Sequence, residues 1–284
     1  MKTNPFQDRI ALVTGAGDGI GRALAVALAR KKAQVIVSGR RIETVRETVE
    51  LIQEEGLIAF PQELDVTCEA DVKALIQEVV GHHGRLDYMV NNAGISIAGE
   101  MRDLAIDDYK KVIDVNLMGL IYGTFHAYRQ MTHQGSGHIV NISSLAGLVP
   151  FPAKSPYAMT KHAIVGLTTT LRHEAQALGV KVSVACPGLV NTKIWQKTPV
   201  MNIHHDKATH YLLRNPIARL LKKQMSDPMI AARTILKGVE KNKDLIVFPL
   251  HATLTWWIYK LIPPLLNPFG QKMIREFRKF RKES

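Results

Sequence analysis

A glycine-rich turn near the start of the chain constrains the fold more than any other feature. The sequence TGAGDGIGR occupies residues 14–22 and has glycine at positions 15, 17, 19 and 21. An apolar run with strand character, 9–15, leads into this turn, and a helical pattern, 20–31, follows it. Glycine permits a tight turn and a close approach of backbone to a pyrophosphate, while the helix N-terminus presents N–H groups and a partial positive charge. In this context the turn predicts a dinucleotide-binding βαβ unit.

The rest of the chain continues the alternation of strand and helix patterns. Apolar runs rich in valine and isoleucine predict further strands at 34–39, 58–66, 86–94, 137–144, 180–188 and 244–249. Helical patterns between them predict helices at 42–55, 69–81, 104–130 and 156–178. Repeated strand–helix units imply right-handed crossovers and an open parallel sheet. We therefore predict an α/β fold: a single doubly wound Rossmann domain with a parallel sheet of about seven strands and helices on both faces.

The distribution of charge separates the two ends of the chain. Residues 1–190 contain 19 Lys/Arg and 19 Asp/Glu, whereas residues 191–284 contain 18 Lys/Arg and 6 Asp/Glu and carry the whole net charge of +12. A basic region favours an acidic partner, such as a phospholipid surface, a phosphorylated cofactor or carrier, or nucleic acid. We expect residues 1–249 to form the Rossmann-type domain and residues 250–284 to form an apolar and basic C-terminal helical extension. The irregular, basic segment 193–226 is predicted to be a substrate lid over the carboxyl ends of the strands, where open α/β sheets bind ligands.

The end of the second predicted strand bears on which dinucleotide binds. An NAD-binding fold usually places an acid here to hydrogen-bond the ribose 2′-hydroxyl. This strand ends in Ser38, Gly39, Arg40 and Arg41 and has no acid there. Because a guanidinium pairs with phosphate through two hydrogen bonds, Arg40 and Arg41 favour NADP(H) over NAD(H). The alternative is that both arginines are solvated loop charges.

Tyr157 and Lys161 form a candidate acid–base pair in the sequence SPYAMTKHAI at 155–164. Positions i and i+4 lie on the same face of a helix. A cation held beside a phenol lowers the phenol pKa from its usual value of about 10, which makes the group usable near neutral pH. The same spacing is common in surface packing, so the pair needs support from the rest of the chain.

Several motifs have the order and spacing of one enzyme family. They are TGAGDGIG (14–21), Asp65 after the third strand, NNAG (91–94), Asn116 in DVNLMG, NISSLAG (141–147), YAMTK (157–161) and PGLVNT (187–192). In this pattern the chain resembles the classical short-chain dehydrogenases/reductases, densely over residues 6–192 and loosely over 227–249. The serine of that family lies thirteen residues before its tyrosine, which selects Ser144 rather than Ser143.

The resemblance implies four catalytic residues and a hydride-transfer reaction. NADPH would deliver a hydride to a carbonyl carbon while Tyr157 gives a proton to the developing alkoxide, or takes it back when an alcohol is oxidised. Lys161 would lower the pKa of Tyr157 and hold the nicotinamide ribose. Ser144 would position the substrate oxygen, and Asn116 would hold Lys161 through water in a proton relay. Asn92 and Asn116 could instead serve only to satisfy a turn and a helix.

The resemblance also implies a cofactor site that runs from the glycine-rich turn to the segment after the sixth strand. Its members are Gly15, Gly17, Asp18, Gly19, Ile20, Gly21, Arg40, Arg41, Asp65, Val66, Asn92, Ala93, Gly94, Tyr157, Lys161, Pro187, Gly188, Val190 and Thr192. Within this site Asp65 would lie at the adenine, the NNAG segment beside the adenosine ribose, and Thr192 at the nicotinamide amide. Many NADP-using relatives carry a basic residue in the glycine-rich turn, and Asp18 stands there instead, which weakens the preference for NADP(H).

Two interpretations of the C-terminal extension remain open. Residues 250–269 are rich in aromatic and aliphatic side chains, but Lys260 and the two prolines that follow it interrupt any membrane span. Residues 271–284 combine six basic residues with apolar side chains at helical spacing, namely Met273, Ile274, Phe277 and Phe280. The extension is either a membrane-surface anchor or a segment whose apolar side chains pack against the core or another subunit.

These features predict a hydrophobic substrate. A fatty acyl, long-chain keto, sphingoid-base-like or steroid-like carbonyl or alcohol would enter between the lid and the apolar segment. We expect a homo-oligomer, a dimer or tetramer built on the long helices, with a possible peripheral membrane surface. Cys68 and Cys186 are isolated, and the apolar run near the start is too short for a secretory signal, so we expect reduced thiols and a cytoplasmic location.

Other classes of function are considered beside this one. One alternative is an NAD-dependent secondary-alcohol dehydrogenase with a small substrate. Another is a non-catalytic NADP-binding regulatory protein, although this chain keeps both Tyr157 and Lys161. Nucleic-acid binding is not expected because aromatic residues are not interleaved with the basic ones. A metal site is not expected either, since His204, His205 and His210 have no carboxylate or cysteine to complete one.

Overall fold

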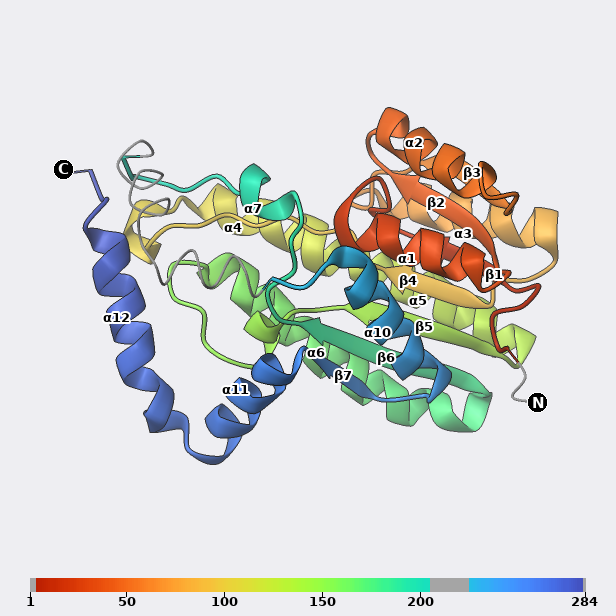
Figure 1. Ribbon diagram of the computed structural model, residues 1–284. Coiled ribbons are helices and arrows are strands. Elements are labelled where there is room, and N and C mark those ends of the chain that lie inside the picture. The colour runs from red at the N-terminus through yellow and green to blue at the C-terminus, as the bar shows by residue number, and fades with distance from the viewer. Residues whose placement is uncertain (1–3, 205–224, 283–284) are drawn as a thin grey trace.

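The computed structural model describes residues 4–204 and 225–282 and has a seven-stranded parallel sheet at its centre (Figure 1). The strands are β1 (Ile10–Val13), β2 (Gln34–Gly39), β3 (Ala59–Glu63), β4 (Tyr88–Asn91), β5 (Gly137–Ile142), β6 (Val180–Pro187) and β7 (Leu245–Phe248). Their spatial order is β3-β2-β1-β4-β5-β6-β7, so the chain begins in the middle of the sheet and winds outward in both directions. The predicted doubly wound α/β fold is confirmed, and the carboxyl ends of β1 and β4 mark the point where the winding reverses.

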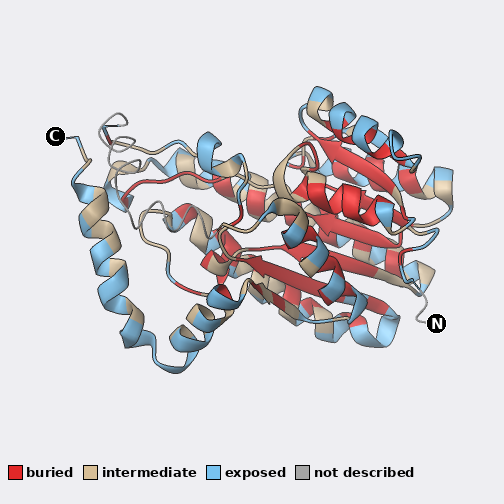
Figure 2. Cartoon of the chain, viewed as in Figure 1, coloured by how far each residue is buried: buried red, intermediate tan, exposed pale blue. Residues whose placement is uncertain are grey.

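Helices cover both faces of this sheet. One face packs against α1 (Gly19–Arg30), α2 (Ile42–Gln53) and α10 (Pro228–Glu240). The other packs against α3 (Glu69–His83), α5 (Gly119–Gln134) and α6 (Ser155–Ala175), which the short 3₁₀ turn η4 (Gln176–Leu178) extends. Figure 2 shows the strands buried between these two layers, as expected for a parallel sheet whose strands are apolar on both faces.

The long helix predicted over 104–130 is interrupted, which corrects that prediction. A 3₁₀ turn, η1 (Met101–Asp103), precedes α4 (Ile106–Ile113), and a π-helical turn, η2 (Asp114–Met118), separates α4 from α5. A π turn adds one residue to the helical circuit and often occurs at a functional site. Here the extra residue directs the fully buried Asn116 toward the backbone of Ile95. Apolar periodicity could not predict this interruption because the sequence continues an ordinary helical pattern on both sides of it.

The C-terminal segment leaves the sheet after β7 and forms an arm of two helices (Figure 1). They are α11 (Leu250–Leu261) and α12 (Asn267–Arg278), joined by the 3₁₀ turn η5 (Pro263–Leu266). Residues 193–204 of the predicted lid include the short helix α7 (Ile194–Lys197). Residues 205–224 of the lid, with His205 and His210, lie outside the described residues. Between β5 and α6 the chain makes one more 3₁₀ turn, η3 (Leu145–Gly147).

Candidate active site

Three of the predicted catalytic residues meet at the carboxyl end of β5. Tyr157 and Lys161 lie one turn apart near the start of α6, and the Lys161 Nζ is 5.6 Å from the centroid of the Tyr157 ring. The buried Lys161 ammonium donates a hydrogen bond of 2.8 Å to the carbonyl oxygen of Ile142 at the end of β5. Ser144 follows β5 directly, and its hydroxyl hydrogen-bonds the phenol of Tyr157. A hydroxyl, a phenol and an ammonium therefore share one site.

The two adjacent serines have different environments. Ser143 is buried, and its hydroxyl donates a 2.8 Å hydrogen bond to the carbonyl oxygen of Lys161. Ser144 is the N-cap of η3, where its hydroxyl accepts a 3.1 Å hydrogen bond from the backbone N–H of Ala146. Ser143 thus ties α6 to the end of β5, whereas Ser144 is the serine beside Tyr157. This geometry agrees with the choice of Ser144 made from spacing.

Burial dominates the electrostatics of the site. It raises the pKa of Tyr157 above the ordinary tyrosine value, and the hydrogen bond from Ser144 opposes that rise only in part. This direction is opposite to the lowering that the spacing predicts. Burial also lowers the pKa of Lys161 to about 8, so its ammonium remains mostly protonated at neutral pH. The thiol of Cys186 is buried nearby with its pKa raised to about 12, which keeps it neutral.

Asn116 is directed into the site by the π turn η2. Its Oδ1 accepts a 2.7 Å hydrogen bond from the N–H of Ile95, and its Nδ2 donates a 2.9 Å hydrogen bond to the carbonyl oxygen of the same residue. A side chain on Gly94 would lie 3.3 Å from Asn116 Oδ1 and 3.7 Å from Lys161 Nζ, so both polar groups border this glycine. Asn116 therefore fixes the segment after β4 next to Lys161.

The glycine-rich turn has the geometry of a dinucleotide cradle. Gly15 has a φ of +63°, and a Cβ there would lie 2.7 Å from Ala93 Cα. A Cβ on Gly21 would collide with the carbonyl oxygen of Gly15 and the side chain of Asn92. Asp18 precedes α1, but its side chain makes no capping hydrogen bond. The first N–H groups of α1 are therefore not capped by Asp18, which suits a pyrophosphate at this helix end.

The charges around this turn are partly engaged with one another. Asp18 accepts a 3.2 Å contact from Arg41 and is also paired with Lys197 of α7. Arg40 is exposed at the end of β2 and forms no ion pair with a described residue. Of the two arginines predicted to bind the 2′-phosphate, Arg41 is thus paired with Asp18 and Arg40 is not.

The segments after β3 and β4 carry the residues that are predicted to lie near the adenosine. Asp65 Oδ1 accepts hydrogen bonds from the N–H and hydroxyl of Thr67, which hold the pKa of Asp65 below its ordinary value. Val66 is buried. The Nδ2 of Asn92 donates to the carbonyl oxygens of Thr14 and Gly15, at 3.0 and 3.1 Å. Asn92 therefore holds the glycine-rich turn against β4, which is a structural role.

The segment after β6 lies opposite the glycine-rich turn. A Cβ on Gly19 would be 3.2 Å from Thr192 Cγ2, so the two loops face each other closely. Gly188, next to Pro187, donates a 2.7 Å backbone hydrogen bond to Phe248, and Val190 accepts a 2.9 Å hydrogen bond from the Trp195 indole. The predicted nicotinamide segment is thereby held between β7 and α7. The loops that carry the predicted cofactor residues therefore lie together at the switch point of the sheet, where open α/β sheets bind ligands.

Comparisons with known proteins agree with this geometry. Residues 9–202 match the family model described as short chain dehydrogenase. This chain belongs to the short-chain dehydrogenases. The putative oxidoreductase SadH of Mycobacterium tuberculosis is 34% identical over 249 residues, which are 87% of this chain and 88% of SadH. The probable oxidoreductase EphD of the same organism is 34% identical over 92% of this chain but only 44% of EphD, so the chain spans less than half of that relative.

Solved structures show the same fold. A short-chain dehydrogenase/reductase from Burkholderia phymatum, determined in complex with NAD, superposes with a TM-score of 0.79 at 26% identity and covers 92% of this chain and 95% of its own. A short-chain type dehydrogenase/reductase from Mycobacterium marinum gives a TM-score of 0.76 at 26% identity, with 88% and 97% covered. The chain therefore shares the fold of the short-chain dehydrogenase/reductase family as well as its sequence pattern.

A buried polar network supports the site of this short-chain dehydrogenase. Asn91 of β4 pairs in register with Asn141 of β5, and Asn91 Nδ2 donates a 2.9 Å hydrogen bond to Asn141 Oδ1. Asn91 also donates to Thr124 of α5, and Asn141 to Thr168 of α6, at 3.1 and 3.0 Å. Neither Asn91 nor Asn141 was predicted as a site residue, although two asparagines inside otherwise apolar strands are the signal that could have revealed them.

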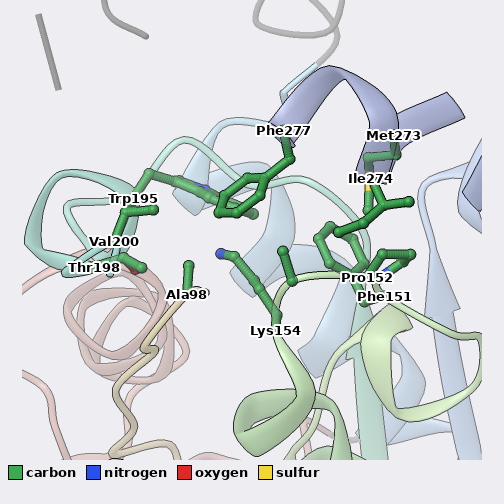
Figure 3. A pocket seen from close by; sticks show the side chains of 11 residues that line it. Ala98, Phe151, Pro152, Lys154, Trp195, Thr198, Val200, Met273, Ile274 and Phe277 are labelled. Carbon is green, nitrogen blue, oxygen red and sulfur yellow. The ribbon is translucent and has the colours of Figure 1, made fainter. Parts of the chain in front are cut away.

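A cavity of about 270 Å³ has Lys154 in its wall (Figure 3), and the Nζ of this lysine is 6.0 Å from the centroid of the Tyr157 ring. Its walls come from the loop before α6, from the lid around α7, and from α12. They are almost wholly apolar and include Phe151, Trp195, Met273, Ile274 and Phe277. The apolar side chains of α12 thus face the enzyme, as the packing interpretation of the extension predicts.

Two arginine–carboxylate pairs hold α12 in this position. Arg278 contacts Glu100 through two nitrogens, with a shortest distance of 2.9 Å, and Arg281 contacts Asp103 at 2.8 Å. Both carboxylates are buried, and the arginines lower their pKa values, that of Asp103 to about 2. One backbone hydrogen bond of 2.8 Å, from the N–H of His204 to the carbonyl oxygen of Phe280, adds a further link to the segment after α7.

Proposed function

We propose that this dehydrogenase interconverts a ketone or aldehyde and an alcohol, uses NADP(H), and acts on a hydrophobic substrate that is lipid-like, long-chain or steroid-like. One observation carries the proposal: a cavity lined by aromatic and aliphatic side chains from three segments of the chain also has Lys154 in its wall, and the Lys154 Nζ lies 6.0 Å from the centroid of the Tyr157 ring. A polar substrate would leave its hydrogen-bonding groups unsatisfied against these walls. An apolar chain would bury its surface there.

The chemistry follows from the residues around the phenol. The glycine-rich turn and the segments after β4 and β6 would hold a nicotinamide dinucleotide, which would supply or accept the hydride. Ser144 hydrogen-bonds the substrate oxygen and holds it within reach of Tyr157. Tyr157 donates its proton to that oxygen in reduction and accepts it in oxidation. Lys161, which is protonated at neutral pH, favours the phenolate, and Asn116 positions the backbone that borders Lys161.

The preference for NADP(H) is supported by the end of β2. Arg40 and Arg41 follow Gly39 where an acid would select NAD(H), and Arg40 is exposed and not paired with Asp18. The pairing of Arg41 with Asp18 and the NAD in the Burkholderia structure favour the alternative, an NAD-dependent dehydrogenase of small secondary alcohols. An Arg40→Ala variant is expected to raise KM for NADPH about tenfold or more and to leave KM for NADH unchanged, and equal effects on both would favour the alternative.

Replacement of the phenol tests the reaction itself. Tyr157→Phe is expected to lower kcat for carbonyl reduction by about 10²- to 10⁴-fold because it removes the proton donor. Tyr128→Phe on α5 is the matched control and should retain activity. A carbonyl screen of increasing chain length, run with NADPH and NADH, measures the rates. Full activity of Tyr157→Phe would contradict the mechanism, and a wild-type protein that binds NADPH but reduces no carbonyl would support the non-catalytic regulatory role.

The extension also supports a proposal about partners. Within the described residues, no helix has the length and apolar character to cross a membrane. Residues 250–269 nevertheless expose eight large apolar side chains, which suits peripheral contact with a lipid surface. Phe125 of α5 and Met159 of α6 are exposed on the long helices, where we expect the contacts of a homo-oligomer. Light scattering on the purified protein would measure its assembly.

A further inference from the structure

Lys154 is a charged residue inside an otherwise uncharged cavity. Its side chain lines the apolar pocket beside Tyr157, and none of the other residues that line this pocket is ionisable. Figure 3 shows the ammonium nitrogen directed into the space enclosed by Ala98, Trp195 and Phe277. The lysine lies just before α6, three residues ahead of the phenol, so its Nζ is 6.0 Å from the centroid of the Tyr157 ring.

Aromatic faces lie around the ammonium, and the described residues supply no counter-ion to it. The Nζ lies 4.2 Å from the centroid of the Trp195 ring and 5.9 Å from that of Phe151, and it forms no hydrogen bond or ion pair with any described residue. The attraction of aromatic faces for a cation is weaker than the hydration that an ammonium loses when it is buried. Burial accordingly lowers the pKa of Lys154 to about 8.

Three described acids that contact the segment around α7 or the end of the chain are already paired with other cations. Glu100 and Asp103 bind Arg278 and Arg281, and Asp18 binds Lys197. Lys154 is therefore left with a charge that the described residues do not neutralise, next to the reacting group. A ligand could neutralise it. A single compact ammonium matches a monoanionic carboxylate, whereas phosphate is better bound by several donors or by the two-pronged guanidinium group.

We propose that Lys154 binds the carboxylate of the substrate, so that the enzyme acts on an oxo or hydroxy acid whose apolar chain fills the pocket. The inference rests on the proposed function, since it takes Tyr157 as the group at the reacting carbon. A carboxylate at about 2.8 Å from the ammonium would lie only a few bonds from the carbon whose oxygen Tyr157 protonates. The acid would thus be anchored at the charged end of its chain, and the walls from α7 and α12 would contact the rest.

Matched substrates test this assignment. Hydroxy acids of increasing chain length, each beside its methyl ester, are assayed with wild type, Lys154→Met and Lys154→Arg. Lys154→Met is expected to reduce kcat/KM for the acid by roughly 10- to 100-fold, mainly through KM, and to leave the ester unchanged or improved. Lys154→Arg keeps the charge and should retain much of the preference for the acid. Lys110→Met, at an exposed surface position, is the control and should change neither substrate.

A binding measurement separates this inference from the proposed function. Calorimetry with a saturated fatty acid and its methyl ester, neither of which can react, measures the carboxylate contact without turnover. The inference is supported if wild type binds the fatty acid more tightly than the methyl ester and Lys154→Met does not. This result does not depend on whether any hydroxy acid is oxidised. The inference would be overturned if wild type and Lys154→Met had the same ratio of acid affinity to ester affinity and also the same ratio of kcat/KM for the acid and the ester. Intact acid binding with no turnover of any carbonyl or alcohol would overturn the proposed reaction alone.

Discussion

Two kinds of single residue have large effects in this dehydrogenase: a glycine that allows a close backbone contact, and a charged side chain that is held away from water. Gly21 shows the first case. It lies within α1, where ordinary helix propensity would favour alanine, yet a Cβ there would collide with the carbonyl oxygen of Gly15 and the amide of Asn92. The absence of a side chain lets the turn fold back against the segment after β4.

A Gly21→Ala variant is expected to lose both stability and cofactor affinity. The added methyl group must displace backbone, which typically lowers the free energy of unfolding by about 1–3 kcal/mol. Gly81→Ala in α3 is the matched control because a Cβ there meets nothing within 4 Å. It should raise stability by about 0.5–1 kcal/mol through helix propensity. Urea unfolding and NADPH titration measure the two effects, and equal stability of the variants would contradict the steric argument.

Lys154 shows the second case, because a buried ammonium destabilises the folded protein in a way that depends on pH. Its pKa is lowered from 10.5 to about 8, so below pH 8 both folded and unfolded chains hold the proton and the full penalty is present. Between about pH 8 and 10.5 only the unfolded chain holds it, so stability rises with pH. Lys154→Met should therefore gain on the order of 1 kcal/mol at pH 7, and less at pH 10. Thermal melts across this range measure the difference, and a gain that is independent of pH would exclude the buried charge as its source.

Elements show which parts of the structure could be predicted from the sequence. Within each of the glycine-rich turn, NISSLAG and YAMTK, the important residues are only a few positions apart in the sequence. Their spacing alone therefore predicts that they lie close together. The wall formed by α12 is different, since Arg278 and Arg281 contact Glu100 and Asp103 across 178 residues of chain. No local pattern encodes such a contact. The amphipathic pattern indicated an apolar face on α12, but it left open whether protein or lipid covers that face.

The π turn was missed for a related reason. Asn116 was predicted from its motif, yet the same residues read as part of one continuous helix over 104–130. Its conformation depends on the two hydrogen bonds to Ile95, a contact between segments that helical periodicity does not register. The pKa direction of Tyr157 was wrong for the same kind of reason, because the extent of burial is a property of the folded chain.

The position of α12 predicts that its apolar side chains limit the length of the substrate. Phe277 lines the pocket, so Phe277→Ala should enlarge it and shift the best carbonyl substrate toward longer chains, with roughly a 10-fold change in the long-to-short ratio of kcat/KM. Phe269→Ala removes a phenyl ring from the same helix, but Phe269 is 66% exposed and does not line the pocket. This control should keep the wild-type ratio. An equal shift in chain-length preference in both variants would show that the substitutions act by destabilising α12 as a whole and not by enlarging the pocket.

At the scale of the whole molecule, the arm formed by α11, η5 and α12 has two different surfaces. Its inner side closes the pocket, while its outer side carries the exposed apolar residues of the segment 250–269. On α11 these residues recur at helical spacing, as Leu250, Leu254, Trp257, Ile258 and Leu261. Lys260 lies over the rings of Trp256 and Trp257, at 5.5 and 5.2 Å, an arrangement that suits the boundary between acyl chains and headgroups.

This outer surface is predicted to bind vesicles that contain anionic lipid. In a flotation assay the wild-type protein should rise with such vesicles, and the double substitution Trp257→Glu with Leu261→Glu should reduce the floating fraction several-fold, because charge on the apolar face opposes insertion. Ile230→Glu on α10 is the control, since Ile230 is exposed to a similar degree but lies away from the arm. Light scattering on the same variants detects the competing outcome, in which the double variant dissociates an oligomer. Loss of assembly without loss of flotation would assign the surface to a second copy of the chain rather than to lipid.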